Sequence, residues 1–333
     1  MAPIRKAEKD ERLSAVVTSR TPLYYEEGAD PRMDRPAYVR SGSGVVWLRT
    51  RERLAVIQDD ASFLALVDPR TFKATAVTLP WERGGQRQFD ATRGNKAEKL
   101  DLEACVVVAI DENVDRLIAF GSGSSPMREK VLIVDVSRDE IDARLVDAHA
   151  LYEAMRSRTG FSGSDLNIEG ACVVGETLRF FQRGNGAERD GLKAVDATCD
   201  VNLFQLLSSL DAPDLMSVPA IENVHVYDLN ELQNVRLSFT DATMQGDQLC
   251  FLAAAEASPN AIDDGPVAGV AFGIAAEDGL RIAAITEADG SPFLAKAEGL
   301  VANPYHDGEF FLVTDLDDPN LPSELCTLSI SFV

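Results

Sequence analysis

The stretch Leu166-Asn-Ile-Glu-Gly-Ala-Cys-Val173 places an acidic residue directly ahead of a short run of small and β-branched residues. The pattern recurs, with a polar or acidic residue in the position of Glu169, at Arg40–Trp47, Leu100–Val107, Leu237–Met244 and Ala295–Ala302. Each copy is followed by a polar turn and a second apolar run, which predicts an antiparallel strand pair. Repetition at a period of roughly 60 to 70 residues is typical of a β-propeller with long loops between its strands.

The units along the chain predict an all-β fold, a five-bladed β-propeller that forms a single domain over residues 1–333. The last unit has only three strand patterns before Val333, whereas Leu13–Tyr24 is an additional strand pattern ahead of the first unit. We expect this N-terminal strand to complete the last blade, because closure of the ring would leave no long open sheet edge. The predicted blades span about 37–80, 99–147, 165–229, 235–287, and 295–333 with strand 13–24.

Segments between these strand patterns are expected to contain little other structure. Two short helices are predicted, at Ala148–Arg156 and Leu203–Leu210. The segments 81–99, 151–165 and 188–220 are predicted to be long loops, which in a compact domain often carry function.

The charge balance excludes some classes of partner. The 333 residues include 54 Asp and Glu against 32 Lys and Arg, a formal net charge of -22. The resulting negative electrostatic potential is opposite in sign to the one that nucleic-acid binding requires. It also disfavours binding to an anionic membrane surface. No stretch is long and apolar enough for a membrane-spanning segment, and no apolar signal-peptide core follows the charged N-terminus. The five scattered cysteines predict free buried thiols in a reducing compartment, so we expect a cytoplasmic protein.

The residues that begin the five first strands are the candidates for a functional site. In a propeller these strands line the axis, and their starting ends face the same rim. The residues expected to converge there are Ser43, Glu103, Glu169, Thr240 with Asp241, and Glu298. Carboxylates that face one another in a narrow channel repel each other, which raises their pKa values or requires a cation. Because the set offers oxygen ligands and no Cys or His, it favours Ca²⁺, with Mg²⁺ as the alternative and zinc disfavoured.

Other interpretations of these acids remain open. Backbone N–H groups or a nearby cation, such as Lys296 beside Glu298, could satisfy each carboxylate locally. Ordered water or ion pairs between subunits could also take the place of the metal.

The order of these residues resembles that of the calcium-activated nucleotidases, or apyrases. Those proteins are five-bladed propellers with one axial Ca²⁺, and their inner strands present a hydroxyl residue, Glu, Glu, a hydroxyl residue and Glu. Ser43, Glu103, Glu169, Thr240 and Glu298 reproduce that order. The Glu-Gly pairs at strand starts are also similar to those of phytase-like and esterase-like propellers, and the chain looks like bacterial propellers of unassigned function.

The resemblance also implies a place for catalysis. In the nucleotidases an acidic loop after the second strand of the first blade belongs to the active site. Here the loop reads Gln58-Asp-Asp-Ala-Ser62, which keeps the Asp pair and lacks the neighbouring Arg of that family. Asp59 and Asp60 are therefore the candidate catalytic residues.

The ends of the second strands should share the rim with the acids. Gly121-Ser-Gly-Ser-Ser125 is predicted to bind an anion through its backbone N–H groups and through Ser122 and Ser124. Arg128 and Arg183 could hold a phosphate or carboxylate between them. In the alternative interpretation the glycine-serine run is a plain turn and both arginines pair with rim acids.

Two functions follow from this set of residues. The first is a metal-dependent hydrolase of phosphorylated or other anionic small molecules, in which an Asp orients water. The second is a non-catalytic module that binds a ligand or protein and holds a structural axial metal.

Overall fold

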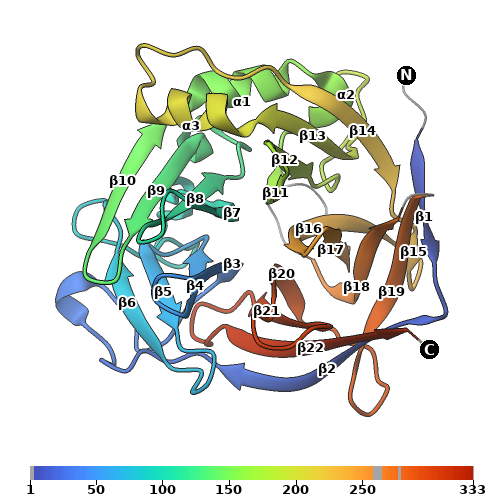
Figure 1. The fold of residues 1–333 in the computed structure, drawn as a ribbon, viewed down its shortest axis with the longest axis horizontal. Helices are drawn as coiled ribbons and strands as arrows, with labels where there is room; N and C mark the ends of the chain where they lie inside the picture. The colour runs from blue at the N-terminus through green and yellow to red at the C-terminus, as the bar shows by residue number, and fades with distance from the viewer. Residues whose placement is uncertain (1–3, 258–264, 277–278, 333) are drawn as a thin grey trace.

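The computed structural model describes residues 4–257, 265–276 and 279–332. Groups of antiparallel strands surround a common centre (Figure 1). In chain order the groups are β3 (Gly42–Leu48), β4 (Arg53–Gln58), β5 (Phe63–Val67) and β6 (Ala74–Thr78); β7 (Leu102–Ala109), β8 (Asp115–Gly121), β9 (Lys130–Val136) and β10 (Ile141–Asp147); β11 (Ile168–Val174), β12 (Thr177–Gln182), β13 (Asp196–Asn202) and β14 (Glu222–Asp228); β16 (Val235–Gln245), β17 (Gln248–Glu256), β18 (Val267–Ala276) and β19 (Gly279–Glu287); and β20 (Lys296–Ala302), β21 (Glu309–Asp315) and β22 (Glu324–Phe332) with β2 (Leu13–Pro22).

The first strand of each group lies nearest the centre (Figure 1). Consecutive first strands contact one another in a closed circuit, β3 with β7, β7 with β11, β11 with β16, β16 with β20, and β20 with β3. Apolar cores fill the spaces between neighbouring groups. Between β8 and β12, for example, the rings of Phe120 and Phe180 pack edge to face with centroids 4.9 Å apart. Sheets that radiate from a central axis and pack face to face form a β-propeller.

The N-terminal strand closes the ring. β2 pairs antiparallel with β22, from Leu13 opposite Phe332 to Pro22 opposite Glu324. It also pairs in parallel with β19 of the preceding group. The predicted pairing of this strand with the last group is confirmed, with the strand ending at Pro22.

A second N-terminal strand, β1 (Arg5–Lys9), bridges two groups at their outer edges. It pairs in parallel with β14 and with β19. The smaller elements are β15 (Glu231–Leu232), which pairs with β16, and the 3₁₀ turns η1 (Pro31–Met33), η2 (Lys96–Glu98) and η3 (Pro126–Arg128).

The predicted helices are confirmed as α1 (His149–Arg156) and α3 (Leu203–Asp211), and α2 (Thr159–Ser162) follows α1. No helix in the described part of the chain has the length and apolar character needed to span a membrane.

The prediction of a long loop over 188–220 is wrong, because this segment contains β13. The strand reads Asp-Ala-Thr-Cys-Asp-Val-Asn, and Asp, Ala and Asn are all depleted in strands. Tertiary partners overcome this preference. Asp196 is paired with Arg236, 2.6 Å between Oδ2 and the guanidinium, and Asp200 is paired with Arg179, 2.7 Å from Oδ1 to Nε.

Candidate functional site

A β-bulge interrupts each first strand at the position singled out from the sequence. The register between first and second strands shifts around one extra residue, which is Ser43, Glu103, Glu169, Thr240 or Glu298. A bulge bends the strand and re-aims the side chain of its extra residue. The five residues are therefore equivalent in structure as well as in sequence.

Two of the bulge residues are followed by glycine because neighbouring first strands approach each other closely at these positions. A Cβ atom on Gly170 would lie 3.0 Å from Cα of Asp241, and one on Gly299 would lie 2.8 Å from the backbone nitrogen of Val45. Only glycine fits so near another backbone. The Glu-Gly pairs are thus a consequence of the narrow centre of the ring.

The three bulge glutamates line one small cavity at the centre of the ring, of about 50 Å³. Its wall is almost wholly polar or charged. The lining residues are Asp59, Lys96, Lys99, Asp101, Glu103, Arg128, Asn167, Glu169, Arg183, Asn185, Lys296, Glu298 and Asp315. We call this space the axial cavity.

Arg183 lies at one side of the axial cavity, where it is only 4% exposed and contacts several acids. Its guanidinium lies 2.5 Å from Glu256, 3.3 Å from Glu169 and 3.8 Å from Glu298. Glu298 also lies 3.1 Å from the ammonium of Lys296. Two of the bulge glutamates are therefore paired with cations of the chain itself.

The other side is organised by Lys99, whose ammonium bridges Asp59 at 2.5 Å and Asp101 at 2.6 Å. Burial alone would lower the pKa of Lys99, but Asp101 and Asp59 outweigh it and raise that pKa well above its usual value. Asp101 is further held by Arg128, at 2.8 Å, and by the hydroxyl of Ser122. Asp101 has few remaining lone pairs to offer a ligand.

Glu103 and one oxygen of Asp59 differ from these paired groups. Within the described residues, Oδ1 of Asp59 is buried and has no hydrogen-bond partner. Glu103 has no hydrogen bond or ion pair among the same residues, and burial, followed by the charges of Asp101 and Glu169, raises its pKa well above the usual value. Carboxylate oxygens of Asp59, Asp101 and Glu103 lie within 4.8 Å of one another, close enough to share one metal ion.

The formal charges around the axial cavity sum to a value that one divalent cation would balance. Among the described residues, its acids with Glu256 outnumber its Lys and Arg residues by two. The acids are Asp59, Asp101, Glu103, Glu169, Glu256, Glu298 and Asp315; the bases are Lys96, Lys99, Arg128, Arg183 and Lys296. This excess of buried acids makes protonation of some of them more favourable than in water. Burial raises the pKa of Asp315 to about 7, and it raises the pKa of Glu298 well above its usual value.

The other three predicted metal ligands lie outside the wall of the axial cavity and join neighbouring first strands. Ser43 donates a hydrogen bond of 2.5 Å to the carbonyl of Leu102, and Thr240 donates one of 2.9 Å to the carbonyl of Ala297. The carboxylate of Asp241 accepts from the backbone N–H of Leu300 at 2.7 Å. The structure therefore brings together Glu103, Glu169 and Glu298, and uses Ser43, Thr240 and Asp241 to connect strands.

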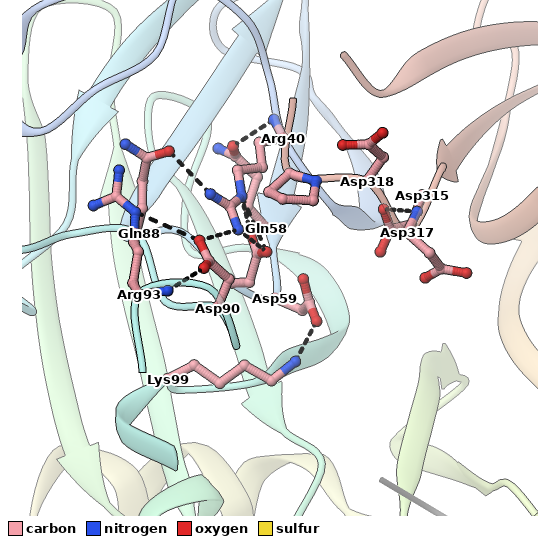
Figure 2. A network of polar contacts seen from close by, with 12 residues as sticks. Arg40, Gln58, Asp59, Gln88, Asp90, Arg93, Lys99, Asp315, Asp317 and Asp318 are labelled. Atoms are coloured by element: carbon pink, nitrogen blue, oxygen red, sulfur yellow. Dashed lines mark hydrogen bonds and ion pairs between the residues drawn. The ribbon is translucent and has the colours of Figure 1, made fainter. Parts of the chain in front are cut away.

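Asp59 and Asp60 are adjacent in the chain but have different partners. Figure 2 shows Asp59 in contact with Lys99, apart from the network of Arg40, Gln88 and Asp90. Asp60 receives three contacts from the buried guanidinium of Arg40, the shortest at 2.6 Å, and Arg40 also contacts Asp90 and Gln88. Burial, followed by the charge of Asp59, raises the pKa of Asp60 to about 6. Asp60 therefore holds Arg40, and Asp59 is the member of the pair that lines the axial cavity.

The serine hydroxyls of the glycine-serine run are engaged in contacts with one another and with nearby side chains of the chain. The hydroxyls of Ser122 and Ser124 lie 2.9 Å apart, and Ser124 accepts from Arg128 at 2.9 Å. Arg128 and Ser122 both bind Asp101. Arg128 and Arg183 both form ion pairs with acids of the chain, as in the alternative interpretation of the sequence.

Sequence reasoning missed Lys99, Asp101 and Arg40. Asp101 lies two residues before the bulge residue Glu103, at the place taken by Asn167 before Glu169 and by Lys296 before Glu298. This second polar position in each repeat was the signal available. Arg40 and its partners come from separate loops, and their meeting follows only from the fold.

Comparison of the sequence with protein families gives one match. The model of the family of unknown function DUF6929 matches residues 38–330. The chain belongs to this family. No curated protein matches the sequence.

Solved structures similar to this DUF6929 protein have low sequence identity. A luciferin-regenerating enzyme is 9% identical with a TM-score of 0.42, over 89% of this chain and 94% of the other. A gluconolactonase from Xanthomonas campestris is 9% identical with a TM-score of 0.38, over 96% and 87%. Virginiamycin B lyase from Staphylococcus aureus is 9% identical with a TM-score of 0.38, over 95% and 99%. The resemblance to the nucleotidases stays a prediction.

Proposed function

We propose that this DUF6929 protein is a single five-bladed propeller domain that binds one divalent cation in the axial cavity. The observation that supports the proposal is Oδ1 of Asp59, a buried acceptor without a partner among the described residues, beside the carboxylates of Asp101 and Glu103. A buried polar atom without a partner is costly, and a cation would satisfy several such oxygens at once.

Calcium is the proposed ion, and magnesium is the alternative. The donors are all oxygens, which hard cations prefer. Asp59 and Glu103 supply the open ligand atoms, and Asp101 is a third neighbour already engaged by Lys99 and Arg128. Because the protein supplies so few ligands, water molecules must complete the coordination shell of the cation. Ca²⁺ accepts such an irregular arrangement more readily than Mg²⁺, which requires a near-octahedral one.

The activity we propose for this site is hydrolysis of a small anionic molecule, such as a phosphoester. A second pocket of about 170 Å³ adjoins the axial cavity, and Asp59, Lys96, Lys99 and Asp315 line both spaces. A substrate in the second pocket would lie next to Asp59, whose Oδ1 would hold the cation and so help to place a water molecule on that cation beside the substrate. The bound cation would supply charge neutralisation for the anion.

A non-catalytic binding module is the second candidate. It is favoured by the contacts of Arg128 and Arg183, which are committed to Asp101, Glu169 and Glu256 and are thus not free to clamp a phosphate.

Calorimetric titration of Ca²⁺ and of Mg²⁺ into chelator-treated protein tests the proposal. We expect saturable binding of one ion per chain, with Ca²⁺ the tighter. Glu103→Gln should weaken it at least about tenfold, because affinity depends strongly on the number of charged ligands. Glu112→Gln is the matched control, since Glu112 is exposed. Absence of binding, or equal affinity in Glu103→Gln, would contradict the proposed metal site.

A panel of phosphoesters and other esters separates the two candidates. Turnover that disappears with chelator and in Asp59→Asn would support the hydrolase. Metal binding without turnover on any substrate would support the binding module. Asp59→Asn is a better choice than Asp60→Asn, because Asp60 neutralises the buried Arg40 and its replacement would disturb the fold.

A further inference from the structure

The ammonium group of Lys99 lies among the acids of the proposed cation site. The side chain is 8% exposed, and it lines both the axial cavity and the second pocket. Figure 2 shows the extended side chain with its nitrogen at the carboxylate of Asp59. Lys99 leaves the 3₁₀ turn η2 in an extended backbone conformation, and the next residue, Leu100, is buried in the apolar core. The fold therefore fixes the base of this side chain.

Lys99 binds two of the three acids that lie close enough to share a metal ion. Its nitrogen is 2.5 Å from Oδ2 of Asp59 and 2.6 Å from Oδ1 of Asp101. A carboxylate oxygen of Glu103 lies within 4.8 Å of oxygens of these two residues. An ammonium group has N–H donors and no acceptor, so it can neutralise acids but cannot bind a metal. Lys99 thus places a positive charge beside the proposed position of the cation.

The contact with Lys99 leaves the other oxygen of Asp59 open. The ammonium takes Oδ2, and Oδ1 is buried without a hydrogen-bond partner among the described residues. Arg128 contacts Asp101 through the oxygen that Lys99 does not use, Oδ2. Lys99 therefore neutralises this group of acids only in part.

We propose that Lys99 is a resident counter-ion of the cation site, which holds Asp59 and Asp101 together in the absence of metal and lowers the affinity of the site for the metal. The inference rests on the proposed cation site. An ammonium group that orders the acids favours metal binding, whereas repulsion between the ammonium and the cation opposes it. Repulsion dominates because both charges share the same carboxylates in a buried cavity, where water and salt screen them weakly.

Calorimetric titration of Ca²⁺ into chelator-treated Lys99→Met protein tests this inference. The substitution removes one positive charge from the site, so we expect Ca²⁺ to bind about tenfold more tightly or better than in the unaltered chain. The metal-free variant should melt at a lower temperature, because Asp59 and Asp101 lose their counter-ion. Saturating Ca²⁺ should restore most of that loss. Lys73→Met removes an exposed charge and should leave both the affinity and the melting temperature unchanged.

The sign of the change in affinity separates this role from a purely structural one. If Lys99 only supported the fold of the site, its loss would weaken Ca²⁺ binding. Equal or weaker affinity in Lys99→Met would therefore overturn the inference. If Lys99→Met does not fold with or without Ca²⁺, Lys99→Gln decides the question, because glutamine keeps hydrogen-bond donors and lacks the charge.

The same titrations distinguish failure of the inference from failure of the proposed function. Binding to the unaltered chain without tighter binding to Lys99→Met would keep the cation site and overturn the role of Lys99. Binding to Lys99→Met alone would support the role of Lys99 and contradict a cation site in the unaltered chain. Binding to neither protein would contradict both.

Discussion

Removal of residues 1–22 is expected to prevent the chain from folding to a stable monomer. The deletion takes away β2, which pairs with both β22 and β19, and exposes an open sheet edge. It also removes Leu13, Ala15 and Val17 from the core between the last two groups. Each large apolar side chain contributes about 1.5–3 kcal/mol on burial. Together with the lost strand pairing, this is comparable to a typical total stability of about 5–15 kcal/mol.

Thermal and urea unfolding followed by circular dichroism would measure this effect. Deletion of residues 1–9 is the control, because it removes β1 and leaves β2 in place. We expect the shorter deletion to retain cooperative unfolding with a modestly lower midpoint. If the chain lacking residues 1–22 unfolds cooperatively near the midpoint of the full chain, then β2 does not close the ring in the manner described.

Replacement of Arg183 by methionine is expected to lower the free energy of unfolding by about 3–5 kcal/mol. Met matches much of the side-chain volume, but it leaves Glu169, Glu256 and Glu298 without the guanidinium that they surround. Buried carboxylates that lose their cation must either take up protons or draw in water. Denaturant titration at neutral pH measures the change.

Two further variants show whether charge is the cause. Arg183→Met/Glu256→Gln removes one of the surrounding carboxylates and should recover part of the lost stability. Arg189→Met alters an exposed arginine paired with Asp165 and should change stability by less than about 1 kcal/mol. A cost for Arg183→Met as small as that for Arg189→Met would show that Arg183 does not hold the acids together.

The repeated first strands could be predicted because their pattern is local. A polar residue ahead of a small and β-branched run marks a strand start, and Glu-Gly marks the bulge and the close strand contact that follow it. Recurrence of that pattern also predicted correctly that Glu103, Glu169 and Glu298 would share one cavity.

The contacts inside the site could not be predicted, because they join residues that are distant in the chain. Arg183 meets Glu256 from another group, and Lys99 reaches Asp59 across 40 positions. The sequence analysis assigned Ser43 and Thr240 to a metal because hydroxyls are possible ligands. In the structure each donates a hydrogen bond to a neighbouring first strand, a contact that depends on the spacing of the strands. β13 was missed for the same reason, since Arg236 and Arg179 stabilise its acids from outside the segment.

Diffraction from crystals grown with Mn²⁺ tests most directly whether the ring of bulged strands binds a cation. Mn²⁺ prefers the same oxygen ligands as Ca²⁺ and Mg²⁺ and gives a strong anomalous signal. We predict a single anomalous peak in the axial cavity, in contact with Asp59 and Glu103 and absent from Glu103→Gln crystals. An axial cavity that contains only water, with the peak missing or located elsewhere, would contradict the proposed metal site.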